Sequence, residues 1–132
     1  MKKKRIILFF LIAFILFFFY FAVIGRNPGR IAPRYILDLF WIYRHPGSHS
    51  FKGICLNILC FIPIGIMVGL ISDKYRILKV LIVGLFVSLV VEFSQLIWAK
   101  GVFDVDDLFN NSLGAAVGGL AVVLALKLWN KQ

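Results

Sequence analysis

Residues Ile6–Ile24 read IILFFLIAFILFFFYFAVI and contain no charged side chain. A helix over this range is roughly 28 Å long at 1.5 Å per residue, close to the ~30 Å hydrocarbon core of a bilayer. The segment follows the basic run KKKR, but it is longer than the apolar core of a signal peptide, which spans about 7–15 residues. We therefore predict an uncleaved transmembrane helix.

The rest of the chain has the same character. Of its 132 residues 61% are hydrophobic, whereas a soluble domain is about 45–50% apolar. Three further apolar runs are each long enough to cross a bilayer. The sequence predicts one all-α domain over residues 1–132, with transmembrane helices at 6–24, 54–71, 77–98 and 111–129.

The net charge of +9 comes from basic residues that mostly flank these apolar runs. In that position they set topology and contact anionic lipid, so nucleic acid is not an expected partner. With both termini in the cytoplasm, nine of the 15 Lys and Arg residues lie inside and six outside. We predict a multi-pass protein of the cytoplasmic membrane in this orientation, although the external loop over residues 25–53 is itself basic.

Within that loop the stretch RYILDLFWIYR, residues 34–44, carries a helical pattern of apolar side chains. Ile36, Leu39, Phe40 and Tyr43 follow the i, i+3, i+4, i+7 spacing of an amphipathic helix. With its aromatic residues, such a helix suits the headgroup layer. It is either an anchor or a lid that clamps a lipid headgroup.

One carboxyl group lies inside the third apolar run, in SLVVEFSQLIW (residues 88–98). Ser88 and Gln95 are at i−4 and i+3 from Glu92, on the same helix face. Ionisable residues at membrane depth usually face a protein interior or a cavity. This polar stripe is therefore expected to face other helices rather than lipid.

The flanking apolar runs also carry polar groups near the same membrane surface. Asn57 lies near the start of the second run. One face of the fourth helix is predicted to hold Asp104, Asp107, Asn111, Gly114 and Gly118. Asp106 and Asn110 lie off that face, and Asp104 suits the position that caps the helix. The glycines favour close packing against the second or third helix.

Three segments thus contribute polar side chains at matching depth. The predicted ligand-binding residues are Asn57, Ser88, Glu92, Gln95, Asp104, Asp107 and Asn111. The cluster either holds a ligand or joins the helices by hydrogen bonds, and the two roles are compatible. No cofactor is predicted. No metal site is predicted either, and Cys55 and Cys60 point to different faces of one helix.

In this order the patterns N57…F61-x-P63-x-G65, S88-x-x-x-E92-x-x-Q95 and D104-x-x-D107-x-x-x-N111-x-x-G114-x-x-x-G118 resemble the VanZ-like family of small bacterial membrane proteins. The resemblance covers Asn57 to about Leu120. It implies a cell-envelope protein that affects the response to the lipid-tailed glycopeptide teicoplanin. The family often has an arginine near position 100 or 101, where this chain has Lys100 and Gly101.

Several functions fit these features. In the first, a polar pocket near the outer membrane face engages a membrane lipid headgroup, a lipid-linked cell-wall intermediate or a lipoglycopeptide antibiotic, and lowers susceptibility to teicoplanin. In the second, the protein is an enzyme on a lipid-linked envelope substrate, with Glu92 and Asp107 as acid and base. A transporter and a structural subunit of a larger membrane complex are further alternatives. The sequence alone does not decide between them.

Overall fold

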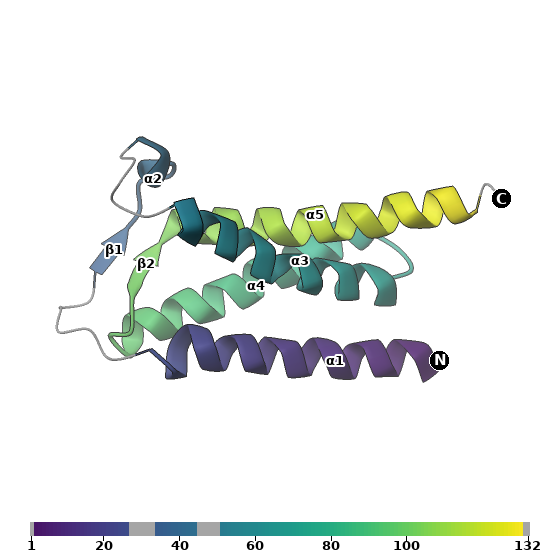
Figure 1. Cartoon of the computed structure of the whole chain (residues 1–132), viewed down its shortest axis with the longest axis horizontal. Coiled ribbons are helices and arrows are strands. Elements are labelled where there is room, and N and C mark those ends of the chain that lie inside the picture. Colours follow the sequence, from purple (N-terminus) through teal and green to yellow (C-terminus); the bar gives the residue numbers. More distant parts are fainter. Residues whose placement is uncertain (1, 27–33, 45–50, 131–132) are drawn as a thin grey trace.

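The computed structural model describes residues 2–26, 34–44 and 51–130, and four long helices form a bundle with a small sheet at one end (Figure 1). The long helices are α1 (Lys2–Phe19), which continues into the π-helical turn η1 (Tyr20–Ile24), α3 (Phe51–Ile71), α4 (Arg76–Ile97) and α5 (Val105–Trp129). Each is long and apolar enough to cross a membrane. The prediction of an all-α, multi-pass membrane protein is confirmed.

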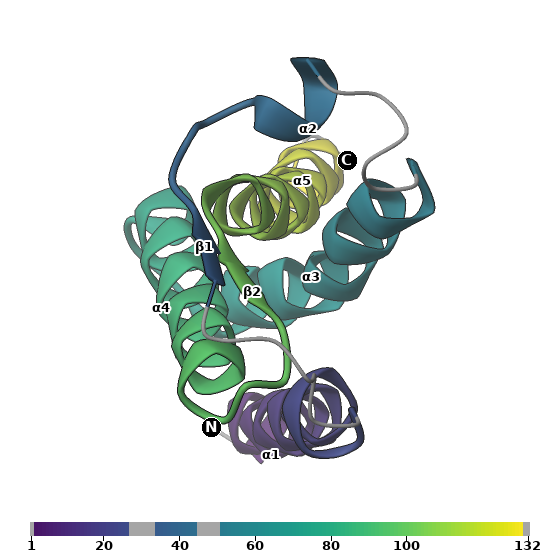
Figure 2. The ribbon, with the colours of Figure 1, turned by 90° about the vertical axis from the view of Figure 1, so that its left-hand side faces the viewer.

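The start of α1 and the end of α5 lie at the same end of the bundle (Figure 1). The opposite end, here called the strand end, holds β1 (Arg34–Ile36), the short helix α2 (Trp41–Arg44) and β2 (Val102–Asp104). Viewed from the strand end, α5 lies opposite α1, with α3 and α4 on the two sides (Figure 2). The described parts of the predicted loop over residues 25–53 lie at this end, and residues 27–33 and 45–50 lie outside the described residues.

The fourth transmembrane helix begins earlier than the apolar pattern predicts. α5 starts at Val105 rather than near residue 111, because the polar residues before the apolar run suit the first turn of a helix. Asp104 is the N-cap, and its side chain accepts a hydrogen bond from the backbone N–H of Asp106. Asp106 and Asp107 follow in the first turn, where carboxylates interact favourably with the helix dipole.

The closest contact in the bundle is between α3 and α5, which touch through backbone atoms. A Cβ on Gly114 would lie 2.2 Å from the carbonyl oxygen of Ile58, and one on Gly118 would lie 2.2 Å from that of Ile62. No other residue type fits at these distances. This confirms the prediction that the glycines of the last helix allow close packing, and it identifies α3 as the partner.

Helix α1 is the least buried of the long helices, and most of its large apolar side chains are exposed. It contacts α3 through Phe18, whose ring meets the ring of Phe61 edge to face at 5.4 Å. At the end opposite the strands, Lys4 forms an ion pair with Asp73. This hydrogen bond and the lysine charge hold the pKa of Asp73 below its usual range. Since the pair is exposed, it adds little stability.

The predicted amphipathic helix over residues 34–44 is wrong for most of its length. Arg34–Ile36 is a strand that pairs in parallel with Val102–Asp104, and only Trp41–Arg44 is helical. Phe40, immediately before α2, has a φ of 64°, a left-handed conformation that interrupts a continuous helix. The local helical periodicity is therefore overridden by strand pairing between residues 68 positions apart, Arg34 and Val102.

The glycine contact leads to a test with a matched control on the same helix. Replacing Gly114 by leucine forces α3 and α5 apart, and we expect a loss of about 1–3 kcal/mol or more in unfolding free energy. Ala121, an exposed residue of α5, is replaced by leucine as the control. Membrane abundance and the melting temperature in detergent are measured. Equal values for Gly114→Leu and Ala121→Leu would contradict the close packing.

Candidate functional site

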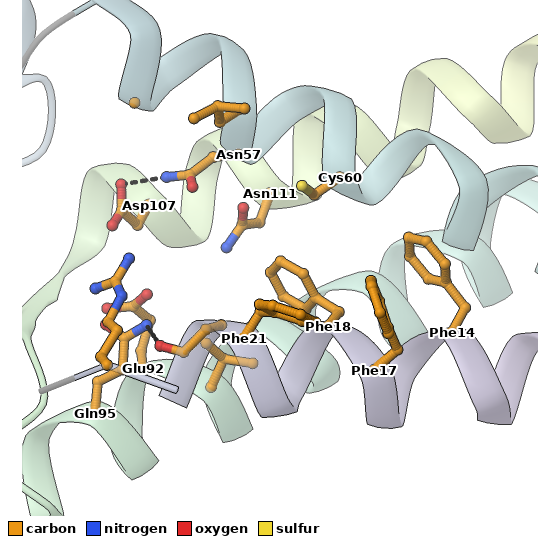
Figure 3. Close-up of a pocket in the computed structure, with 15 residues that line it drawn as sticks. Phe14, Phe17, Phe18, Phe21, Asn57, Cys60, Glu92, Gln95, Asp107 and Asn111 are labelled. Carbon is orange, nitrogen blue, oxygen red and sulfur yellow. Dashed lines mark hydrogen bonds between the residues drawn. The ribbon is translucent and has the colours of Figure 1, made fainter. Parts of the chain in front are cut away.

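The strand end of the bundle encloses a cavity of about 420 Å³ to which all four long helices contribute (Figure 3). That volume is within the range of small-molecule sites, about 300–1,000 Å³. Its walls combine polar side chains from α3, α4 and α5 with aromatic side chains from α1. The lining residues are Phe14, Phe17, Phe18, Phe21, Ala22, Arg26, Gly53, Leu56, Asn57, Cys60, Val91, Glu92, Gln95, Asp107 and Asn111.

Two hydrogen bonds join helices at the polar part of the cavity, one between two lining residues and one from a lining residue to a buried one. Asn57 Nδ2 donates to Asp107 Oδ1 at 2.6 Å, from α3 to α5 (Figure 3). Asn111 Nδ2 donates to Ser88 Oγ at 2.9 Å, from α5 to α4. The backbone contact between α3 and α5 sets the first of these bonds, because Gly114 lies two helical turns from Asp107 on the side that meets α3.

Glu92, 2% exposed, connects α4 to the start of α5. Its Oε2 accepts a hydrogen bond from the backbone N–H of Asp104 at 3.1 Å. Asp104 in turn caps α5 through the N–H of Asp106. Gln95, one turn further along α4, donates from Nε2 to the backbone oxygen of Ala22 at 3.1 Å. The polar stripe predicted on the third transmembrane helix therefore faces the protein interior.

The seven predicted site residues have two different placements. Asn57, Glu92, Gln95, Asp107 and Asn111 line the cavity. Ser88 is fully buried behind Asn111, and Asp104 is buried in β2 and the helix cap. Ser88 and Asp104 hydrogen-bond to neighbouring helices and do not line the cavity. Ligand binding by the seven residues stays a prediction.

Asp106 and Asn110, which lie off the predicted polar face of the fourth helix, are both fully buried. Asp106 Oδ1 accepts a hydrogen bond from the backbone N–H of Phe40 at 2.5 Å, and Asn110 Oδ1 accepts one from the Tyr43 hydroxyl at 2.8 Å. They hold α2 against α5. The signal was present in the sequence, because Asp106 and Asn110 have the same i, i+4 spacing as Asp107 and Asn111 on the adjacent face.

Neither the apolar wall of the cavity nor the cationic side chain of Arg26, among the described lining residues, was predicted from the sequence. Phe14, Phe17 and Phe18 of α1 and Phe21 of η1 line the cavity, but they belong to a uniformly apolar segment in which periodicity marks no inward face. Arg26 follows η1, where a basic residue is expected simply to mark the end of a transmembrane segment. Only the packing of α1 beside α3 shows that these residues face a shared space.

The polar part of the cavity is rich in oxygen acceptors, from two carboxyl groups and the amide side chains. Such a surface binds hydrogen-bond donors and cationic groups. Among the described residues, no group of three or more His, Cys, Asp or Glu side chains is placed to hold a metal ion.

Comparison with protein families identifies the chain. The sequence model described as VanZ/LLP1 matches residues 5–126, nearly the full length. The chain belongs to the VanZ/LLP1 family. Parallel searches of curated proteins and of solved structures gave no significant match.

In this VanZ/LLP1 chain the residues that replace the expected arginine, Lys100 and Gly101, have clear structural roles. Lys100 donates through Nζ to the backbone oxygens of Ile24 and Arg26. A Cβ on Gly101 would lie 2.6 Å from Gln95 Oε1 and 3.3 Å from Arg26 Nη1. The pair thus fixes the chain after η1 and leaves room for the Arg26 guanidinium at the cavity.

The hydrogen bond between Tyr43 and Asn110 allows a test of what retains α2 on α5. Replacing Tyr43 by phenylalanine leaves the buried Asn110 oxygen without its donor, at a cost of about 1–3 kcal/mol. We expect amide hydrogen exchange of residues 40–44 to become roughly tenfold faster. Tyr35→Phe, at an exposed position in β1, is the control. Unchanged exchange in Tyr43→Phe would show that this hydrogen bond does not retain α2.

Proposed function

We propose that this VanZ/LLP1 protein acts in the bacterial cytoplasmic membrane and lowers susceptibility to teicoplanin-type lipoglycopeptides. Its cavity at the strand end engages a lipid headgroup, a lipid-linked cell-wall intermediate or the antibiotic itself. The observation that carries this proposal is one cavity whose lining combines buried polar groups with an aromatic wall. Such a lining suits a ligand that has both a polar head and a lipid tail.

The proposal also places the strand end outside the cell and both termini in the cytoplasm. The distribution of basic residues supports this orientation. Lys2, Lys3, Lys4 and Arg5 begin α1, and Lys74 and Arg76 lie at the short connection between α3 and α4. All six lie at the end opposite the strands (Figure 1). The acidic start of α5 lies at the strand end.

A pair of exposed tyrosines tests the orientation. Tyr35 lies at the strand end and Tyr75 at the opposite end, and both side chains are exposed. Each is replaced by cysteine in a background with Cys55→Ala and Cys60→Ala. We expect a membrane-impermeant maleimide to label Tyr35→Cys in intact cells and Tyr75→Cys only after permeabilisation. The reverse pattern would invert the topology and place the cavity near the cytoplasm.

The function itself is tested by expression in a Gram-positive host that lacks its own family member. The wild type should raise the inhibitory concentration of teicoplanin more than that of vancomycin, a glycopeptide without a lipid tail. Asp107→Asn and Asn111→Ala should lose most of this protection at equal membrane abundance, whereas Glu92→Gln, which keeps an oxygen acceptor, should retain it if the cavity only binds its ligand. Asp73→Asn, which removes an acid at the opposite end, is the control and should protect as the wild type does.

The outcomes separate the roles of the polar residues. Full protection by all three variants would mean that these side chains only join the helices. Loss in Asp107→Asn and Asn111→Ala with full protection in Glu92→Gln would favour binding, since an uncharged amide still accepts a hydrogen bond. The enzyme alternative requires that Glu92→Gln lose function, because glutamine cannot transfer a proton. That alternative is favoured by the presence of two carboxyl groups in one cavity.

A further inference from the structure

The two parts of the cavity differ in chemistry and are arranged along the bundle. Gln95, Glu92 and Asp107 lie on one side in Figure 3, and Phe14 and Phe17 lie on the other, deeper in the bundle. Asn111 and Cys60 lie between these two sets (Figure 3). A ligand that fills the cavity must therefore be polar at the strand end and apolar toward the bundle centre.

The charges at the polar part favour a particular headgroup. Glu92 and Asp107 bring two carboxyl groups to the lining, and Arg26 brings one guanidinium. All three charged side chains line one cavity, and Glu92 and Asp107 lie on the same side of it (Figure 3). A cationic donor between the carboxyl groups relieves their repulsion, and an anionic group beside Arg26 balances its charge.

A buried amide oxygen also lacks a donor at this place. Asn111 is 3% exposed and lines the cavity. Its Nδ2 donates to Ser88, but its Oδ1 finds no hydrogen-bond partner among the residues that the structure describes. A buried acceptor without a donor costs about 1–3 kcal/mol. A ligand with N–H groups supplies the missing donor.

The cavity opens between α1 and α3. Phe17 of α1, Phe21 of η1 and Leu56 of α3 line it, yet they are 62%, 59% and 59% exposed. In a bilayer these rim residues face hydrocarbon, since both helices span the membrane. An alkyl chain can therefore enter sideways from the lipid while its headgroup stays at the level of Glu92, about 8 Å from the end of α4.

We infer that the cavity takes an amphiphile whose primary ammonium group binds among Glu92, Asp107 and the Oδ1 of Asn111. Its alkyl chain lies along the phenylalanines of α1. This inference rests on the proposed function and narrows its ligand class. Two sources share this chemistry: a membrane aminophospholipid, whose phosphate then faces Arg26, and a lipid-tailed glycopeptide with a free amine, which has no phosphate.

Native mass spectrometry of the purified chain in detergent tests the headgroup. The probes are lysophosphatidylethanolamine and lysophosphatidylglycerol with the same acyl chain, and teicoplanin. We expect the ethanolamine lipid to bind about tenfold more tightly than the glycerol lipid, equivalent to ~1.4 kcal/mol. Asp107→Asn and Asn111→Leu should abolish this preference, and Asn111→Asp should keep or increase it. Asp73→Asn is the control.

Arg26→Gln distinguishes the two sources. It should weaken binding of both lysophospholipids and leave teicoplanin unaffected if the drug also occupies the cavity. If Asp107→Asn weakens the binding of teicoplanin, the drug is a ligand of the cavity. If only the lysophospholipids bind, the ligand is a membrane aminophospholipid. Equal binding of the two lysophospholipids by the wild type overturns the inference, and so does a preference that persists in both Asp107→Asn and Asn111→Leu. Asn111→Asp keeps the test informative where Asn111→Leu does not fold.

The experiments distinguish a failure of the amphiphile site from a failure of the resistance role. Headgroup preference without any teicoplanin protection in cells would uphold the amphiphile site and reject the resistance role. Teicoplanin protection that depends on Asp107, without any headgroup preference in binding, would uphold the resistance role and reject the amphiphile site.

Discussion

The backbone contact between α3 and α5 is the constraint on which the rest of the structure depends. Gly114 and Gly118 let the carbonyl oxygens of Ile58 and Ile62 approach to distances that any side chain would block. In a bilayer there is no hydrophobic force between helices, so such close packing supplies much of the attraction. It also sets the distance between Asn57 and Asp107, whose hydrogen bond closes one wall of the cavity.

A second constraint acts at the strand end, where the polar start of α5 is buried. Polar groups removed from water must find partners within the protein. Asp104 does so by capping α5 and by donating its N–H to Glu92. Asp106 receives the N–H of Phe40. Asp104 and Asp106 therefore stabilise the start of α5 and also tie other segments to it, α4 through the backbone N–H of Asp104 and the residue before α2 through the carboxyl group of Asp106.

These constraints position the candidate site without α1. The polar side chains come from α3, α4 and α5, whereas α1 adds the aromatic wall and is itself largely exposed. Edge-to-face contact of Phe18 with Phe61 holds it beside α3. A peripheral helix next to a polar cluster leaves a space that is open to lipid on one side, and this arrangement gives the cavity its two-part chemistry.

The sequence by itself determined the membrane-spanning helices, the inward direction of Glu92, and the role of the glycines, because hydrophobic length, helical spacing and residue size are local properties. Tertiary structure alone decided the rest. Arg34–Ile36 is a strand because Val102–Asp104 lies beside it, and no local pattern encodes that pairing. Asp106 and Asn110 are buried because α2 covers their face. The phenylalanines of α1 line a cavity because α3 and α4 leave a polar space beneath them, and in an all-apolar helix periodicity cannot distinguish that face from the one toward lipid.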